Sequence, residues 1–262
     1  MKAGVALRTA ALQIARLDAE VLMAHLLGIP RLAMLLDLDR PAPPGFDALV
    51  ERRASGKPVA YITGSREFWS LDLCVTPDVL IPRPDSETLI EAAIAHGGTP
   101  TTILDLGTGS GALLLAALSV WPGAMGVGID ASPAALAVAK ANAERLGFAD
   151  RATFALGDWN GDGGTHDLIL CNPPYIADGE PLPRDVADWE PHGALFAGPV
   201  GLDDYARIAP LLPAQLSAAG VACIEIGATQ ADAVTVLFVA QGLAVELRRD
   251  LAGLPRCLVV TK

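Results

Sequence analysis

One segment limits the possible folds of this chain more than any other. It reads as a buried strand, followed by a glycine-rich turn and then by an apolar helix. Residues 102–106 predict the strand, three glycines follow at alternate positions from 107 to 111, and residues 112–118 predict the helix. Glycine permits a tight turn and a close approach of the backbone to a ligand, and the next helix N-terminus offers free N–H groups. The segment therefore predicts a ligand-binding turn at the end of a strand.

Beyond residue 101 the chain alternates between strand and helix patterns, which is typical of a Rossmann-like, doubly wound, mostly parallel α/β sheet. Further strands are expected at residues 124–130, 153–159, 168–171, 220–226, 243–248 and 257–261. In such sheets, ligands lie outside the carboxyl ends of the strands.

Polar residues stand at several of these expected strand ends. Asp130 can take the two ribose hydroxyls of either NAD or S-adenosylmethionine, or it can cap the next helix. Asp158 can accept a hydrogen bond from an adenine amino group, and Trp159 can pack against the adenine ring. Asp105 can bind the positively charged methionyl part of S-adenosylmethionine. Gly107, with the glycine and alanine that follow it, also satisfies a loose dinucleotide-binding pattern, so a nicotinamide oxidoreductase is an alternative.

The segment Asn172-Pro173-Pro174-Tyr175 follows the expected strand at residues 168–171. The Asn side chain both accepts and donates hydrogen bonds, and two prolines stiffen the loop around it. This arrangement suits a planar nitrogen group, such as an amide or an aromatic amine. A nicotinamide oxidoreductase has no use for it.

The order of these motifs resembles that of class I S-adenosylmethionine-dependent methyltransferases, and more narrowly that of the release factor glutamine methyltransferases (PrmC/HemK family). The narrower resemblance also rests on residues 58–64, 66–68, 80–87, 190–191, 194–195, 225–227 and 250–253. Residues 254–257 depart from the family pattern, which has more polar residues there. The Asn-Pro-Pro-Tyr segment alone is shared with DNA adenine methyltransferases.

The resemblance implies a sheet of about seven strands with the last one antiparallel. It also implies that S-adenosylmethionine is the cofactor and that S-adenosylhomocysteine is the product. We expect no metal, because the histidines and cysteines are dispersed and form no metal-binding set. The implied cofactor site consists of Asp105, Gly107, Thr108, Gly109, Ser110, Gly111, Asp130, Asp158, Trp159 and Asn172.

The implied substrate is the glutamine of the Gly-Gly-Gln tripeptide in class 1 peptide chain release factors, which becomes N5-methylglutamine. The Asn172 side-chain oxygen and the Pro173 carbonyl would accept the two amide hydrogens, and Pro174 and Tyr175 would complete the substrate site. Phe68 and Arg83 are candidates either for lining the cleft or for packing between domains.

Three alternatives remain open: a glutamine methyltransferase for a ribosomal protein, an adenine-N6 methyltransferase for nucleic acid, and a catalytically silent cofactor-binding module. The formal net charge of −11 falls entirely on residues 83–262, because residues 1–82 carry nine basic and nine acidic groups. A nucleic-acid binder normally shows a basic footprint. The charge therefore favours a protein substrate.

The expected domains are a helical substrate-recognition domain at residues 1–70, a hairpin and helix linker at 71–100, and a catalytic domain at 101–262. The long irregular segment at 176–201 is typical of a substrate lid. Four scattered cysteines, no run of membrane-spanning length and no signal peptide predict a cytoplasmic protein that does not bind membranes. We expect it to be a monomer.

Overall fold

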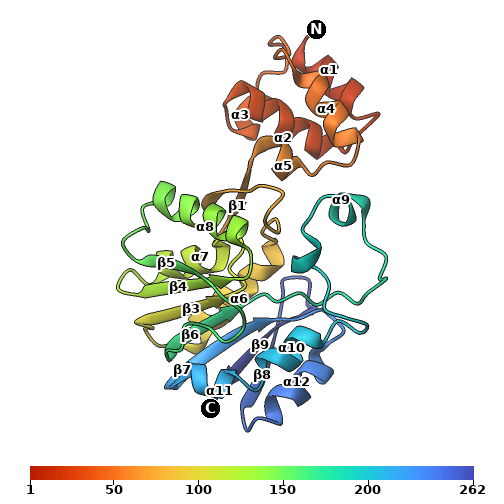
Figure 1. The fold of residues 1–262 in the computed structure, drawn as a ribbon. Helices are drawn as coiled ribbons and strands as arrows, with labels where there is room; N and C mark the ends of the chain where they lie inside the picture. The colour runs from red at the N-terminus through yellow and green to blue at the C-terminus, as the bar shows by residue number, and fades with distance from the viewer. The chain divides into compact units, whose positions relative to one another are not determined.

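The computed structural model describes residues 1–262, which form two compact units (Figure 1). The helical unit consists of Met1–Ser65 together with Leu182–Trp189, and the sheet unit consists of Arg66–Pro181 together with Glu190–Lys262. The division therefore assigns a short piece of the long segment after Tyr175 to the helical unit. The separate linker expected at residues 71–100 is part of the sheet unit.

The helical unit is built around its second helix. Its helices are α1 (Ala3–Ala10), α2 (Arg16–Leu27), α3 (Arg31–Leu35), α4 (Phe46–Ala54), α5 (Val59–Thr63) and α9 (Arg184–Ala187). Leu22 and Met23 of α2 are fully buried with Leu7 and Met34 in one apolar core. The helix ends at Gly28, whose φ of 63° is the left-handed conformation that glycine adopts most readily.

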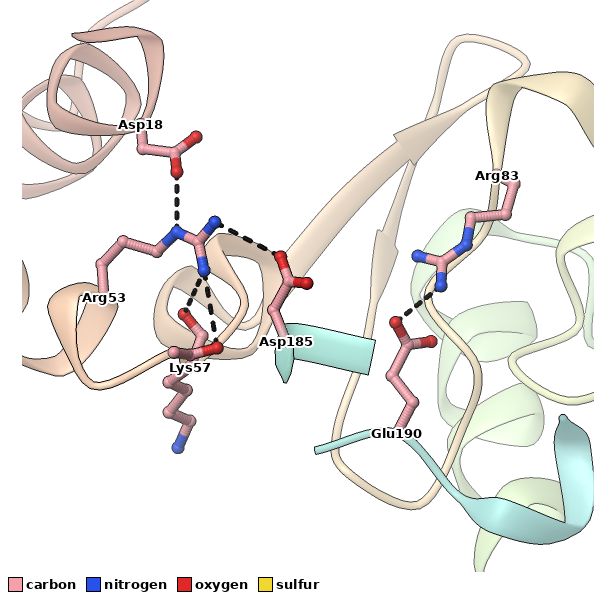
Figure 2. A network of polar contacts seen from close by, with 7 residues as sticks. Asp18, Arg53, Lys57, Arg83, Asp185 and Glu190 are labelled. Carbon is pink, nitrogen blue, oxygen red and sulfur yellow. Dashed lines mark hydrogen bonds and ion pairs between the residues drawn. The ribbon is translucent and has the colours of Figure 1, made fainter. Parts of the chain in front are cut away.

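Arg53 of α4 holds α9 within the helical unit (Figure 2). Its Nε donates to Asp18 Oδ2 at 2.6 Å, and its Nη2 donates to Asp185 Oδ2 at 3.3 Å. Lys57 places its ammonium group 5.2 Å from the centre of the Trp189 ring, where a cation is attracted to the aromatic face. The segment expected to be one irregular piece at 176–201 therefore contains a helix with its own anchors.

The sheet unit contains a seven-stranded sheet in the order β5-β4-β3-β6-β7-β9-β8. The strands are β3 (Thr102–Leu106), β4 (Met125–Asp130), β5 (Ala152–Leu156), β6 (His166–Cys171), β7 (Leu216–Glu225), β8 (Ala244–Arg249) and β9 (Pro255–Thr261). β9 runs antiparallel to both of its neighbours, β7 and β8, while β3, β4, β5, β6 and β7 pair in parallel. The predicted doubly wound sheet, with its last strand antiparallel, is confirmed.

Each face of this sheet is covered by helices (Figure 1). One face packs against α6 (Glu87–His96), α7 (Ala112–Val120) and α8 (Pro133–Leu146), and the other against α10 (Asp203–Ile208), α11 (Leu212–Gln215) and α12 (Ala231–Val239). Successive residues of a strand point to opposite faces. Ile103 accordingly lies in one apolar core and Leu104 in the other, both fully buried.

A short hairpin precedes α6, formed by β1 (Ser65–Phe68) and β2 (Leu71–Cys74). Apolar residues alternate with others as far as Ile81, a pattern that favours a longer hairpin, but β2 ends at Cys74. Prolines at positions 77, 82 and 84 explain the difference, because proline has no N–H to donate to a strand partner. The chain instead reaches the 3-10 helix η1 (Pro84–Ser86) as an irregular segment.

No helix of the structure combines the length and the apolar character needed to cross a membrane.

Asn142 in α8 connects the hairpin to the glycine turn. Its side chain is fully buried, and its Oδ1 accepts from the Cys74 N–H at 2.7 Å. Its Nδ2 donates to the Cys74 carbonyl and to the Ser110 carbonyl, each at 2.9 Å. One buried side chain thus pairs three backbone groups of two separate segments.

We expect Asn142→Ala to lower the free energy of unfolding by about 2–4 kcal/mol, because it leaves three backbone groups, one buried and two half-buried, without this partner. Urea unfolding followed by circular dichroism measures the change. Glu144→Ala, at an exposed position of the same helix, is the matched control and should change stability by less than about 0.5 kcal/mol. An equally small effect of Asn142→Ala would contradict the role of this side chain.

Candidate active site

A cavity of about 460 Å³ lies in the sheet unit where four parallel strands end. Its wall includes residues 107–110 after β3, residues 129–132 at the end of β4, residues 157–159 after β5, and Asn172 and Pro174 after β6. The predicted strand-end residues therefore meet around one space, although they are separated by tens of residues in sequence.

The glycine turn after β3 approaches the cavity closely. Gly107 has a φ of +71°, and a Cβ placed on it would lie 3.3 Å from Cη2 of Trp159. Gly111 has a φ of +83°, and its Cβ would lie 3.3 Å from that of Ala139 in α8. Side chains at either position would therefore be strained and crowded, which explains the glycines.

Asp130 fixes the shape of the same turn. Its Oδ2 accepts from the Gly109 N–H at 2.8 Å, and its Oδ1 accepts from the Ser132 N–H at 2.9 Å. The cap of α8 is Ser132, whose hydroxyl accepts from the Ala135 N–H at 3.2 Å. A carboxylate has about four acceptor sites, so Asp130 retains capacity for a ligand.

Asp158 and Trp159 lie just beyond the end of β5, at the rim of the cavity. The backbone and side chain of Asn160 donate to Asp158 and lower the pKa of its exposed carboxyl group. The indole N–H of Trp159 donates to Asp204 Oδ1 at 2.8 Å, and the backbone carbonyl of Trp159 accepts from Gln215 Nε2 at 2.7 Å. The indole ring is thus held at a fixed angle.

Asp105 is buried beneath the glycine turn and is not part of the cavity wall. Its Oδ2 accepts from the Thr108 hydroxyl at 2.6 Å, whereas its Oδ1 has no hydrogen-bond partner. Burial raises the pKa of this carboxyl group to about 7.

The loop after β6 brings Asn172 and Pro174 to the cavity, while Pro173 and Tyr175 lie outside its wall. Asn172 Nδ2 donates to the Ser86 hydroxyl at 3.3 Å. The carbonyl of Tyr175 accepts from Gln230 Nε2 at 2.9 Å. The Tyr175 ring is half-buried beside the second core, and this burial raises the pKa of its hydroxyl to about 12.

Phe68 and Arg83, the two cleft candidates, both line the cavity. Arg83 Nη2 donates to Glu190 Oε1 at 2.6 Å (Figure 2), and Glu190 Oε2 accepts from the Ile81 N–H at 3.2 Å. Glu190 is 4% exposed, so its buried carboxylate accepts hydrogen bonds from two residues of the segment that precedes η1. Pro191, the next residue, also lines the cavity.

Sequence reasoning assigned no role to four side chains that position this site: Ser86, Asp204, Gln215 and Gln230. Each acts on a residue far away in the chain, and no local pattern marks it. Ser86 does lie in the segment 80–87, which carries the family resemblance. That resemblance marks the segment as relevant, but it does not reveal the hydrogen bond between Ser86 and Asn172.

Comparison with known proteins identifies the family. Residues 2–64 match the PrmC N-terminal domain, and residues 99–187 match a methyltransferase domain. The release factor glutamine methyltransferase of Rhodospirillum rubrum is 45% identical over 98% of this chain and 82% of its own length. That of Cereibacter sphaeroides is 44% identical over 98% of this chain and 97% of its own. This chain belongs to the release factor glutamine methyltransferase family.

A solved methyltransferase from Pyrococcus furiosus has a TM-score of 0.57 to this methyltransferase, with 16% identity over 82% of this chain and 97% of the other. At that identity the likeness concerns the fold alone. The predicted family and fold are both confirmed.

The burial of Asp105 has a consequence for stability. Its folded-state pKa of about 7 lies above the value of about 3.9 expected when unfolded. The folded state therefore binds the Asp105 proton more tightly than the unfolded state does. The contribution of this proton to the free energy of unfolding is complete below about pH 4, and it is lost as the pH rises through about 7.

We expect the wild-type free energy of unfolding to fall by about 2–3 kcal/mol more than that of Asp105→Asn between about pH 5 and 8. Urea unfolding at each pH gives the difference. Asp150→Asn, at an exposed position, is the matched control and should follow the wild type. A pH dependence that is the same with and without the Asp105 carboxyl group would contradict this assignment.

Proposed function

We propose that this chain transfers a methyl group from S-adenosylmethionine to the side-chain amide nitrogen of the glutamine in the Gly-Gly-Gln tripeptide of class 1 peptide chain release factors. Membership of the family supports the enzyme class and the release factor glutamine as substrate. One observation carries the assignment to this site: Asn172 and the glycine turn line the same cavity.

The residues of the cavity fit S-adenosylmethionine. The turn at residues 107–110 offers side-chain-free backbone at its glycines, and Asp130 has acceptor capacity for ribose hydroxyls. Asp158 would accept from the adenine amino group beside the fixed ring of Trp159. The unpartnered Oδ1 of Asp105 lies beneath this turn, where a cationic ligand would compensate it. When bound, S-adenosylmethionine supplies a methyl group attached to a positively charged sulfur.

Asn172 would orient the substrate amide. Its Nδ2 donates to Ser86, which leaves Oδ1 as the acceptor for a glutamine amide hydrogen. The Pro173 carbonyl would accept the second hydrogen, raising the electron density on an otherwise weak nucleophile. Fixing the reacting atoms in line is worth about 7–11 kcal/mol at best. No strong base is required, because the amide proton becomes acidic only as the new bond forms.

Pro174 would contact the substrate directly from the cavity wall. Tyr175 lies outside the wall, so its part in the substrate site stays a prediction. In its present position Tyr175 packs on the core, and the bond to Gln230 holds the loop in place.

We propose that the helical unit binds the release factor, since it matches the PrmC N-terminal domain and has a core of its own. The same unit holds Leu182–Trp189, which belongs to the segment that follows the substrate loop. The monomeric state, the absence of a metal and the cytoplasmic location stay predictions from the sequence.

Asn172→Ala should reduce methyl transfer below detection, because the substrate amide loses its acceptor, while cofactor affinity changes little. Incorporation of labelled methyl groups into purified release factor, with mass spectrometry of the modified peptide, measures transfer. The matched control is a release factor whose tripeptide glutamine is replaced by alanine, which should receive no label. Near-normal turnover of Asn172→Ala would refute the proposed role. Label in ribosomal protein or nucleic acid, and none in release factor, would favour an alternative substrate.

Asp130→Ala should weaken S-adenosylmethionine binding by about 10-fold or more, because it removes the ribose acceptor and releases the glycine turn. Isothermal titration calorimetry measures the dissociation constant. Asp150→Ala serves as the exposed control. Unchanged affinity in Asp130→Ala would restrict this carboxylate to shaping the turn.

A further inference from the structure

Arg83 is a cation in the wall of the cavity that the proposed mechanism does not use. Its Nη2 donates to Glu190 Oε1 at 2.6 Å (Figure 2), and the side chain of Glu190 is 2% exposed while that of Arg83 is 35% exposed. The Nε and Nη1 atoms of Arg83 have no hydrogen-bond partner in the structure. The buried acid therefore fixes one edge of the planar guanidinium and leaves further N–H donors for a ligand.

The charged groups around this cavity are mostly acidic. Its wall contains four aspartates, namely Asp78, Asp130, Asp158 and Asp204. Such groups suit the ribose hydroxyls, the adenine amino group and the two cationic centres of S-adenosylmethionine. They do not suit its methionyl carboxylate, which is the single negative group of the cofactor, because like charges repel and a desolvated carboxylate needs hydrogen-bond donors.

Two arginines line the cavity, and one of them lies at the end where adenine would bind. Arg207 Nη1 donates to Asp204 Oδ1 at 2.9 Å. The same oxygen accepts from the indole N–H of Trp159 at 2.8 Å, so Arg207 shares a partner with the ring proposed to pack against adenine. Arg83 is the cation that remains for the rest of the cofactor.

Arg83 belongs to the segment that contacts Asn172. Ser86, three positions further along the chain, accepts from Asn172 Nδ2 at 3.3 Å. The methyl group must meet the amide that Asn172 holds, so the methionyl part, whose sulfur carries that methyl group, must lie at this end of the cavity. We propose that Arg83 binds the methionyl carboxylate of S-adenosylmethionine through its remaining N–H donors, while Glu190 holds the guanidinium in place.

This inference rests on the proposed cofactor site and assigns a partner to the one part of the cofactor that the site leaves unpaired. The guanidinium fork matches the two oxygens of a carboxylate, and its five N–H donors allow Arg83 to bond to Glu190 and to a second carboxylate together. The backbone N–H groups at the start of α7 are the other donors that a carboxylate could use. The test must separate these two kinds of donor.

The test compares the binding of S-adenosylmethionine with that of decarboxylated S-adenosylmethionine, which lacks the carboxylate. Isothermal titration calorimetry gives both dissociation constants for wild type and Arg83→Met. We expect Arg83→Met to weaken binding of S-adenosylmethionine by about 10- to 100-fold, because a hydrogen-bonded charge pair is lost. Binding of the decarboxylated ligand should weaken by less than about 3-fold, since it never made this contact.

Further variants keep the result interpretable if Arg83→Met is unstable. Arg83→Met leaves the buried Glu190 carboxylate unpaired, which destabilises the fold, so the double variant Arg83→Met/Glu190→Gln removes both charges and should show the same loss of preference. Arg83→Lys keeps the charge without the fork and should retain part of the preference. Arg207→Met is the matched control, because this second arginine should not change the ratio of the two dissociation constants. Thermal unfolding identifies any variant that has lost its fold.

Three results with folded variants would overturn the inference. Equal losses of affinity for both ligands would make the role of Arg83 merely structural. Unchanged affinity for S-adenosylmethionine would leave the carboxylate to the backbone at the start of α7. Unchanged affinity together with a raised KM for release factor would assign Arg83 to the substrate instead. Wild type that binds neither ligand would remove the proposed cofactor site itself, which distinguishes its failure from that of the Arg83 contact.

Discussion

The parallel direction of β3, β4, β5 and β6 is the constraint on which the site depends. Because these strands run the same way, their carboxyl ends meet at one edge, and that edge is where the cavity lies. Burial on both faces fixes their register. A slip of one residue in β3 would exchange Ile103 and Leu104 between two separate apolar cores. The same apolar packing that stabilises the sheet therefore sets where the polar residues at its ends can stand.

Buried and half-buried polar side chains, rather than the turns alone, hold the loops at this edge. Asn142 bonds to the glycine turn through the Ser110 carbonyl, Asp130 accepts from the N–H of Gly109, and Gln230 donates to the carbonyl of Tyr175. Removing such a partner leaves a buried backbone group unpaired at a cost of about 1–3 kcal/mol. Each loop consequently has little freedom to rearrange when a ligand arrives. This preorganisation suits a reaction in which alignment, and not a strong base, lowers the barrier.

Much of the site was predictable because its parts are local in sequence. The glycine turn and the Asn-Pro-Pro-Tyr loop each follow a strand pattern directly, so a strand, its end and its polar residue are visible together. The positioning partners are different in kind. Ser86 bonds to a residue 86 positions away and Asp204 to one 45 positions away, and only the folded topology joins them. Likewise, the ion pair between Arg53 and Asp185 spans 132 positions, which is why the segment after Tyr175 could not be divided from sequence. The second hairpin strand, β2, ends at Cys74, before the first of several prolines, which lack a backbone N–H. The alternation of apolar residues alone does not reveal such an end.

The carboxyl groups of the site show that residue type alone does not determine charge. The formal net charge of −11 counts every carboxyl group as ionised. Asp158 at the exposed rim has a lowered pKa and remains negative, whereas burial raises the pKa of Asp105 and of Glu225 to about 7. Near neutral pH a substantial share of both buried groups is therefore protonated. A cationic ligand would draw Asp105 back toward its ionised form, since an opposite charge nearby lowers the pKa of a carboxyl group. Binding of the cofactor and the charge beneath the glycine turn are thereby coupled.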